Sequence, residues 1–204
     1  MAQYGPQAID APFQIRYASN LNLGDSYINA TNSGAAGAGL AAGTSASTTG
    51  AFCLNVYAFS PDEQMVACCS CPVTPNGLVK LSVVDDVVYR TLTPAVPTAV
   101  VIKLYSTRPQ GSTCNAATPG PAQPGLLAWG TTLHSYKGPG LAGTKMLETP
   151  FLPATLSTRA GELGGSDISE LGRLTQLCGF IQANGSTYGI CKSCTIGGLG
   201  AGRL

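Results

Sequence analysis

The sequence predicts a mainly β fold, an immunoglobulin-like β-sandwich of about eight strands with one α-helix in its C-terminal half. Three observations indicate this class. Glycine and proline, the strongest turn formers, number 26 and 14 among 204 residues, so turns interrupt the chain often. A hydrophobic fraction of 44% is too high for general disorder. Short apolar or alternating runs recur between the turns, as in sandwiches and barrels.

The first strand is expected at residues 13–18, where Phe13, Ile15 and Tyr17 alternate with polar residues and form one apolar face. Residues 1–12 show no periodicity, which predicts an extended N-terminal arm. The rest of the chain, residues 13–204, is expected to form a single disulfide-rich β domain.

Seven further strands are expected from apolar runs bounded by turn residues. They cover residues 26–31, 51–59, 64–70, 78–84, 98–106, 126–136 and 145–151. Residues 34–50 contain only Gly, Ala, Ser and Thr apart from Leu40, which predicts a mobile loop within the domain. The same small side chains could instead pack closely against a neighbouring subunit.

The helix is expected between a start near Asp167 and an end at Asn184-Gly185. Asp167 can cap the helix, with Glu170 at the reciprocal position of a capping box. Apolar residues then recur at spacings of three and four. Cys178 belongs to this apolar face, so a disulfide is expected to tie the helix to the sheet.

The chain contains eight cysteines, an even number that predicts four disulfides. They are Cys53, Cys68, Cys69, Cys71, Cys114, Cys178, Cys191 and Cys194. Neighbouring residues of a strand point to opposite faces, so Cys68 and Cys69 should bond to different partners. At least one member of the cluster at 68–71 is expected to join the C-terminal cysteines.

Two alternatives to disulfides stay open. Cys191 and Cys194 have the spacing of zinc ligands, and the cluster at 68–71 could supply two more thiolates. The same pair could act in redox catalysis, but a thioredoxin-like site would place it at the start of a helix that follows a strand. Here it lies between Gly189 and a glycine-rich tail. A composition poor in charge and rich in Ser, Thr and Gly favours disulfides and an extracellular location.

The run Cys68-Cys69-Ser70-Cys71-Pro72-Val73-Thr74-Pro75-Asn76-Gly77 resembles a block found in a group of predicted secreted bacterial cysteine-rich proteins. Parts of residues 92–98, 128–134 and 177–185 are similar to the same group, as is the Cys191-Lys192-Ser193-Cys194 pair. The resemblance implies export to the cell surface or the medium. It implies no catalytic residue, because no activity is assigned to the group.

Charge excludes two classes of partner. Charged residues make up 10% of the chain and the net charge is +1, so no cationic surface is available for nucleic acid or an anionic membrane. No apolar run approaches the roughly 18 to 20 residues of a transmembrane helix.

No motif indicates an enzyme. His134 is the one histidine, and no Gly-x-Ser-x-Gly elbow accompanies it, so we expect a structural or exposed residue rather than part of a catalytic triad. Asp62-Glu63 and Asp85-Asp86 are adjacent acid pairs, and solvated turns explain them better than calcium sites. We expect no catalytic residue, no cofactor and no metal.

Sugar could interact with the chain in two ways. Trp129 with Tyr136, or Tyr57 with Tyr105, could stack on a sugar ring, although core packing is the better explanation for so few aromatic residues. Separately, two sequons, at Asn29 and at Asn184, could carry surface glycans.

These observations favour an extracellular structural protein that self-assembles. No Asp, Glu, Lys or Arg occurs in residues 26–61 or 109–136, which suggests uncharged contact surfaces with other copies of the chain. The expected form is a pilus-like filament, in which the strand carrying Phe13, Ile15 and Tyr17 adds to the next subunit. Alternatively, this strand pairs inside its own sandwich. The second function considered is a monomeric secreted binding module, for instance carbohydrate-binding, or a hydrolase of unknown substrate.

Overall fold

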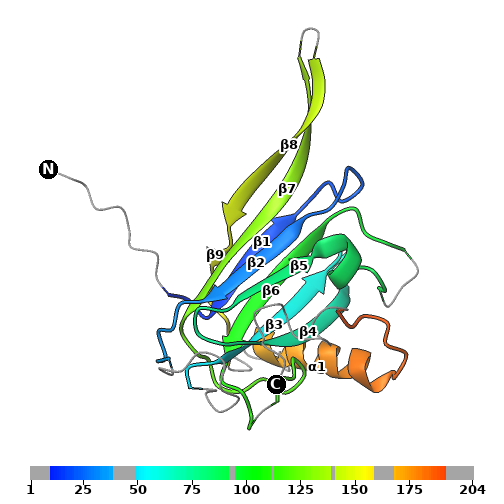
Figure 1. Cartoon of the computed structure of the whole chain (residues 1–204). Helices are drawn as coiled ribbons and strands as arrows, with labels where there is room; N and C mark the ends of the chain where they lie inside the picture. The colour runs from blue at the N-terminus through cyan, green and yellow to red at the C-terminus, as the bar shows by residue number, and fades with distance from the viewer. Residues whose placement is uncertain are drawn as a thin grey trace, which may run out of the picture.

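A computed structural model describes residues 10–38, 49–91, 95–111, 113–138, 141–158 and 168–191. Two antiparallel sheets pack face to face, and one α-helix lies on the outer face of one of them (Figure 1). The predicted mainly β fold, with a helix in the C-terminal half, is confirmed. Within the described ranges, no helix has the length and apolar character needed to cross a membrane.

The five-stranded sheet has the order β4-β3-β6-β1-β9. Its strands are β4 (Met65–Val73), β3 (Phe52–Phe59), β6 (Val100–Thr107), β1 (Phe13–Ala18) and β9 (Leu152–Pro153). The four-stranded sheet has the order β5-β2-β7-β8. Its strands are β5 (Leu78–Ser82), β2 (Tyr27–Asn32), β7 (Leu126–Gly138) and β8 (Leu141–Pro150).

The strand expected at 78–84 is shorter than predicted, because a turn of π-helix, η1 (Val83–Val87), begins after Ser82. The Ser82 hydroxyl accepts a hydrogen bond from the Asp85 amide at 2.7 Å. Asp86 accepts one from the Ser82 amide at 2.8 Å. The acid pair Asp85-Asp86 therefore lies in a capped turn, where the Asp86 carboxylate binds the Ser82 amide.

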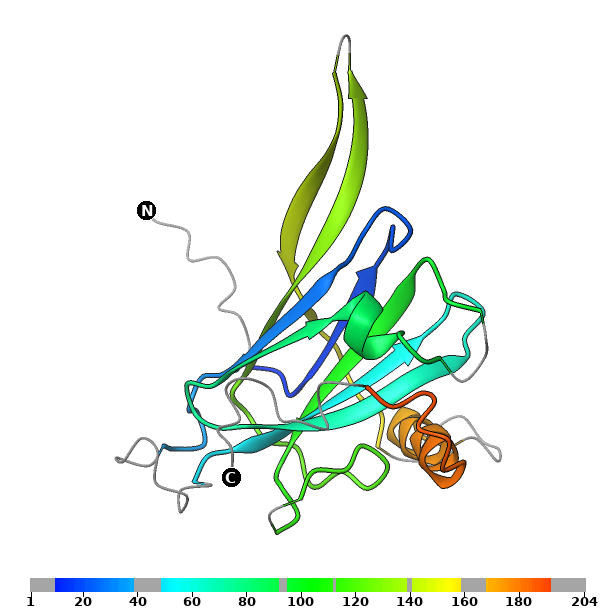
Figure 2. The same cartoon turned by 45° about the vertical axis from the view of Figure 1, so that its right-hand side comes forward.

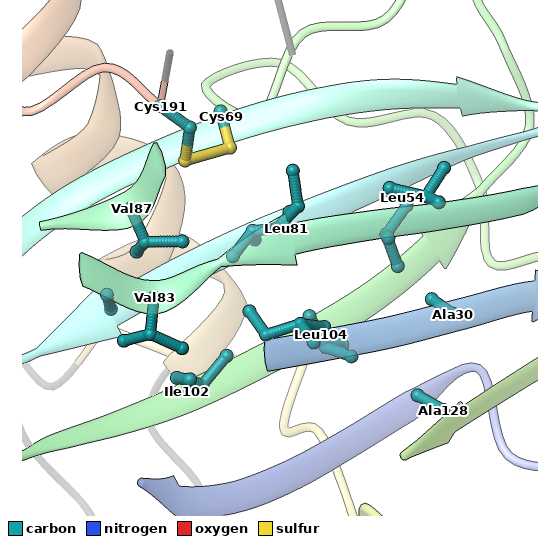
Figure 3. Close-up of a cluster of buried hydrophobic side chains, with 14 of the residues drawn as sticks. Ala30, Leu54, Cys69, Leu81, Val83, Val87, Ile102, Leu104, Ala128 and Cys191 are labelled. Carbon is teal, nitrogen blue, oxygen red and sulfur yellow. A yellow bond between two sulfur atoms is a disulfide. The ribbon is translucent and has the colours of Figure 1, made fainter. Parts of the chain in front are cut away.

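The main core lies between the sheets and receives side chains from both. β3 occupies a central position between β4 and β6, and all eight of its residues are buried. Figure 3 shows side chains of this core from both sheets: Leu54 of β3 and Ile102 and Leu104 of β6 from one, and Ala30 and Leu81 from the other. Burial on both faces explains why the β3 sequence is an almost continuous apolar run.

A second apolar cluster covers the outer face of the five-stranded sheet. The helix α1 (Glu170–Ala183) buries Leu174, Cys178 and Ile181 against this face. Its N-cap is Ser169, whose hydroxyl accepts a hydrogen bond from the Gly172 amide at 3.0 Å. The predicted cap, Asp167, lies outside the described residues.

Three disulfides are described, and two of them follow the alternation of side chains along strand β4. Cys68 bonds to Cys178 of α1, whereas its neighbour Cys69 bonds to Cys191. The third bond joins Cys53 to Cys114. The predictions that Cys68 and Cys69 take different partners, and that the cluster joins the C-terminal cysteines, are confirmed. Cys71 is also disulfide-bonded.

The predicted N-terminal arm and the predicted loop are described only in part. Residues 1–9 and 39–48 lie outside the described ranges. The described end of the arm is bound to the domain: Asp10 accepts a hydrogen bond from the Gly125 amide, and the Pro12 carbonyl accepts one from the Ser106 amide, each at 2.8 Å. Asp10 and Pro12, at the end of the predicted arm, are therefore held by the domain.

We expect peptide mapping under non-reducing conditions to find Cys71 joined to Cys194. The three described bonds use six of the eight cysteines, which leaves Cys71 and Cys194. Cys194 lies outside the described residues. The intact denatured chain should then weigh eight hydrogens less than the reduced chain. Alkylation of any cysteine without reduction, or bound zinc, would contradict this assignment.

Stability should fall as the pH rises above about 10, the ordinary pKa of tyrosine in the unfolded chain. Burial, and then proximity to Tyr105, raises the pKa of Tyr57, whose hydroxyl donates to the Ala116 carbonyl at 2.8 Å. The unfolded chain therefore releases this proton while the folded chain retains it, which favours unfolding at high pH.

The Tyr57→Phe variant tests this dependence through its free energy of unfolding in guanidinium chloride. It should be less stable near neutral pH by about 1 kcal/mol, because the hydrogen bond to Ala116 is lost. Its stability should decline less between about pH 9.5 and 11.5, since Phe cannot ionise. An equal decline in both proteins would show that Tyr57 is not responsible.

Candidate functional site

The most distinctive surface of the molecule is the hairpin formed by β7 and β8. Its strands pair from Trp129–Pro150 to Gly138–Leu141 without a register shift. Figures 1 and 2 show that the hairpin rises well beyond the ends of the neighbouring strands. We call its five outermost cross-strand pairs, from His134–Lys145 to Gly138–Leu141, the hairpin arm.

The hairpin leaves the domain next to Leu133. The Asn20 side-chain amide donates a hydrogen bond to the Leu133 carbonyl at 2.8 Å. Two residues earlier in β7, the Thr131 hydroxyl accepts a hydrogen bond from the Tyr27 amide at 2.8 Å. Above this level, the described side chains of the arm from His134 to Lys137 are exposed. The arm is therefore a two-stranded ribbon, a structure that is only marginally stable in water without a partner.

The base of the hairpin is fastened to β1 by Arg16, which is 8% exposed. Its Nη2 donates to the Thr132 hydroxyl at 2.6 Å, and its Nε donates to the Thr149 hydroxyl at 3.2 Å. One guanidinium thus holds both strands of the hairpin. Desolvation lowers the pKa of Arg16. Gly130 makes room for this side chain, because a Cβ there would lie 2.6 Å from Arg16 Nη1.

The arm and its root carry exposed apolar side chains. Met146 is 61% exposed, and Leu147 and Tyr136 are also exposed. The Tyr136 ring lies over Gly143 on the opposite strand, where a Cβ would be 2.9 Å from the tyrosine oxygen. This aromatic–glycine pair stabilises the ribbon without covering it.

The outer edge of β8 is open. Among the described residues, β8 pairs only with β7 and is the last strand of its sheet. Natural proteins usually shorten, cover or charge such an edge, because its free N–H and C=O groups can pair with another strand. Over the ten residues of β8, the charged side chains are Lys145 and Glu148. The edge is therefore long and weakly protected.

The strand predicted to contact another subunit lies inside its own sheet. β1 pairs with β6 along its whole length, from Phe13–Tyr105 to Ala18–Val100, and with β9 at Gln14 and Ile15. The alternative, in which this strand pairs within its own sandwich, is the arrangement that the structure has. It is also the energetically simpler one, because the main-chain hydrogen bonds are satisfied without a second chain.

The two faces of β1 differ from the expectation of one buried apolar face. Phe13 packs in the cluster beneath α1, Ile15 is half-buried and Tyr17 is 60% exposed. The polar residues Gln14 and Arg16 face the other sheet and are buried there. Gln14 and Arg16 can be buried because they donate hydrogen bonds to β7 and β8. These bonds connect the two sheets.

A small apolar patch remains on the outer face of β1. Leu152 of β9 lies directly opposite Ile15 and is 66% exposed. Tyr17 follows on the same face of β1, opposite the partly buried Val101. We call Ile15, Tyr17, Val101 and Leu152 the β1–β9 patch.

The remaining candidate residues do not form one site. His134 lies in the exposed arm opposite Lys145, and Trp129 lies on the outer face of the four-stranded sheet. Tyr57 and Tyr105 are buried, as core packing predicts. Asp62 and Glu63 occupy an exposed turn.

The two sequon asparagines have different surroundings. Asn29 donates to Glu148 at 3.3 Å from strand β2. Asn184 is the C-cap of α1. Both lie on described surface that a glycan could reach, with Asn184 the more exposed of the two.

A groove of about 490 Å³ lies beside β4, between the edge of this strand and the end of α1. Four disulfide-bonded cysteines line it, together with polar side chains that include Ser70, Thr113, Asn115 and Gln182. Asn115 accepts a hydrogen bond from Gln182 at 2.8 Å. The lining side chains contain no acid, histidine or cation, so the groove offers no side chain for acid–base catalysis.

The hairpin arm was not predicted from the sequence. The expected strands were residues 126–136 and 145–151, so residues 137–144 were assigned to neither strand. Pro139-Gly140 is a strong turn signal, and placing the turn there would have extended both strands.

Comparison of the chain with protein-family models, with curated proteins and with solved structures finds no match. The function must therefore be argued from the geometry of the hairpin and of the surfaces around it.

We expect Gly130→Ala to destabilise the protein by about 1 to 3 kcal/mol, because the added methyl group collides with Arg16 at the base of the hairpin. Chemical denaturation measures the change. Gly179→Ala is the matched control: its Cβ would meet Ala117 at 3.9 Å, and alanine in a helix should stabilise by about 0.5 to 1 kcal/mol. Equal effects at the two positions would contradict the role given to Gly130.

Proposed function

We propose that this protein is an extracellular structural subunit that assembles with copies of itself, as in a pilus-like filament, and that it has no enzymatic activity. The hairpin arm makes the principal contact. This proposal keeps the self-assembly predicted from the sequence and replaces the N-terminal strand by the hairpin as the element that reaches another subunit.

The observation that carries the proposal is the open edge of β8 beside exposed apolar side chains. A monomer would leave the backbone groups of this edge in water together with Tyr136, Met146 and Leu147. A strand from another subunit would satisfy these groups and remove the apolar surface from water, at about 25 cal/mol for each Å² of apolar area.

A second contact is needed if assembly is to continue beyond a pair of subunits. The β1–β9 patch is suited to this role, because it is apolar, lies on the other sheet and exposes Tyr17 and Leu152. The predicted contact residues Ile15 and Tyr17 would then act through their side chains and not by strand addition.

The disulfides support an extracellular location, since they persist in oxidising surroundings and are rare in the cytosol. The low net charge of +1 also supports self-association, because copies of the chain repel one another weakly.

A shortened hairpin tests the proposal. In this variant, Asn-Gly replaces residues 135–144 and joins His134 to Lys145, a cross-strand pair. We expect the full chain to sediment well above its monomer mass of 20.7 kDa and to form particles visible by negative-stain microscopy. The shortened chain should sediment as a monomer and melt within a few degrees of the full chain.

The control is Phe180→Ser, which removes an exposed apolar side chain from α1 and should leave assembly unchanged. Two results would overturn the proposal: a full chain that stays monomeric at high concentration, or a folded shortened chain that assembles as well as the full one.

A second candidate function, carbohydrate binding, is favoured by the surroundings of Trp129. This side chain is 38% exposed on the outer face of the four-stranded sheet, directly opposite Asn29. Asn29 is in turn hydrogen-bonded to Glu148. An aromatic ring beside an amide and a carboxylate can stack on a sugar and bind its hydroxyls. A monomer that binds insoluble polysaccharide, and loses this binding in Trp129→Ala, would favour this candidate.

A further inference from the structure

The direction of the backbone groups along β8 limits which strand can pair with it. The Phe151 amide donates to the Ala128 carbonyl at 2.9 Å, so Ala128 faces β8. The Leu133 carbonyl accepts its hydrogen bond from Asn20, on the opposite side of β7. Hydrogen-bonding groups alternate along an antiparallel strand, so even-numbered residues of β7 face β8 and odd-numbered residues face away.

The free edge of β8 is therefore formed by its even-numbered residues. Met146 is paired with Leu133, and Thr144 and Glu148 occupy equivalent positions opposite odd-numbered residues of β7. The N–H and C=O groups of these residues point away from β7. Pro150 ends the usable edge, because proline has no N–H to donate.

We propose that two copies of the chain pair through their β8 strands, antiparallel about a twofold axis at Met146. This inference rests on the proposed self-assembly and specifies its first contact. A twofold axis perpendicular to the sheet keeps each side chain on its own face, so even-numbered residues pair with even-numbered residues. This is the parity that the free backbone groups require.

Charge and length select Met146 among the neighbouring centres. An axis at Lys145 would place two lysines directly opposite each other, which is destabilising. An axis at Thr144 would move the pairing toward the tip of the hairpin and leave Glu148 and Pro150 unpaired. With the axis at Met146, Thr144 lies opposite Glu148 of the second copy, and Leu147 lies opposite the aliphatic stem of Lys145.

This pairing uses the whole described edge, from Ala142 to Pro150, and forms about eight main-chain hydrogen bonds between the copies. The four-stranded sheets of the two copies become one continuous sheet. Each hairpin arm lies beside the base of the other, where it gains the third strand that a stable ribbon needs. The chain's own edge is thus complementary to itself, which identifies a second copy as the partner.

Single-cysteine variants of the full chain, oxidised after purification and separated by non-reducing electrophoresis, test the register. Met146→Cys should form a disulfide-linked dimer, because paired residues of an antiparallel ladder have Cα atoms about 5.5 Å apart, a distance that a disulfide spans. Thr144→Cys and Glu148→Cys should each form no disulfide link alone and should form a disulfide-linked mixed dimer when combined. Lys145→Cys is the neighbouring control and should cross-link poorly, because its copies would be about 7 to 8 Å apart.

The outcomes separate this inference from the proposed function. If the protein assembles but Lys145→Cys or Thr144→Cys links to itself better than Met146→Cys, the register is wrong and self-assembly stands. The same holds if the protein assembles and no variant cross-links, because β8 is then not the contact. If the unmodified chain stays monomeric in sedimentation, both proposals fail.

Discussion

The structure depends on the pleat of one strand. Because Cys68 and Cys69 are adjacent in β4, they point to opposite faces of the five-stranded sheet. Cys68 reaches Cys178 in the cluster beneath α1, and Cys69 reaches Cys191 in the core between the sheets. Two neighbouring residues therefore bind the layers on both sides of a single sheet. Each bond closes a loop of more than a hundred residues and restricts the unfolded chain, which stabilises the fold by roughly 2 to 5 kcal/mol.

The same disulfides explain why the two sheets have different edges. Gly189 accepts a hydrogen bond from the Cys68 amide at 2.8 Å, and Ile190 forms a parallel bridge with Cys68. The edge of β4 is thus partly covered by chain that a covalent bond retains. No comparable cover lies along β8 among the described residues. The covered edge of β4 therefore contrasts with the long open edge of β8, and this contrast supports the proposed role of β8 in assembly.

Few charges contribute to this arrangement. The described ion pairs both involve Glu170, which contacts Lys103 and Arg173 at the start of α1. Where polar groups are buried between the sheets, they connect strands: Gln14 donates to the Leu126 carbonyl and Asn32 to the Val73 carbonyl. Such buried hydrogen bonds favour one arrangement of the sheets. In any other arrangement these polar groups would be buried away from water without a hydrogen-bond partner, which is costly. Ion pairs at the surface would be weaker and less specific.

The sequence by itself determined the fold class, most strands, the helix and the separation of Cys68 from Cys69. These features depend on local periodicity and on the alternation of side chains along a strand, which a sequence displays directly. It did not determine the role of β1, because alternation shows that two faces differ but not which layer each face meets. Only the tertiary structure placed Gln14 and Arg16 against the other sheet and left Tyr17 exposed. The tertiary structure also determined the hairpin arm. β7 and β8 extend past the domain because residues such as Tyr136 and Gly143 pair, and which residues pair depends on the register of the two strands.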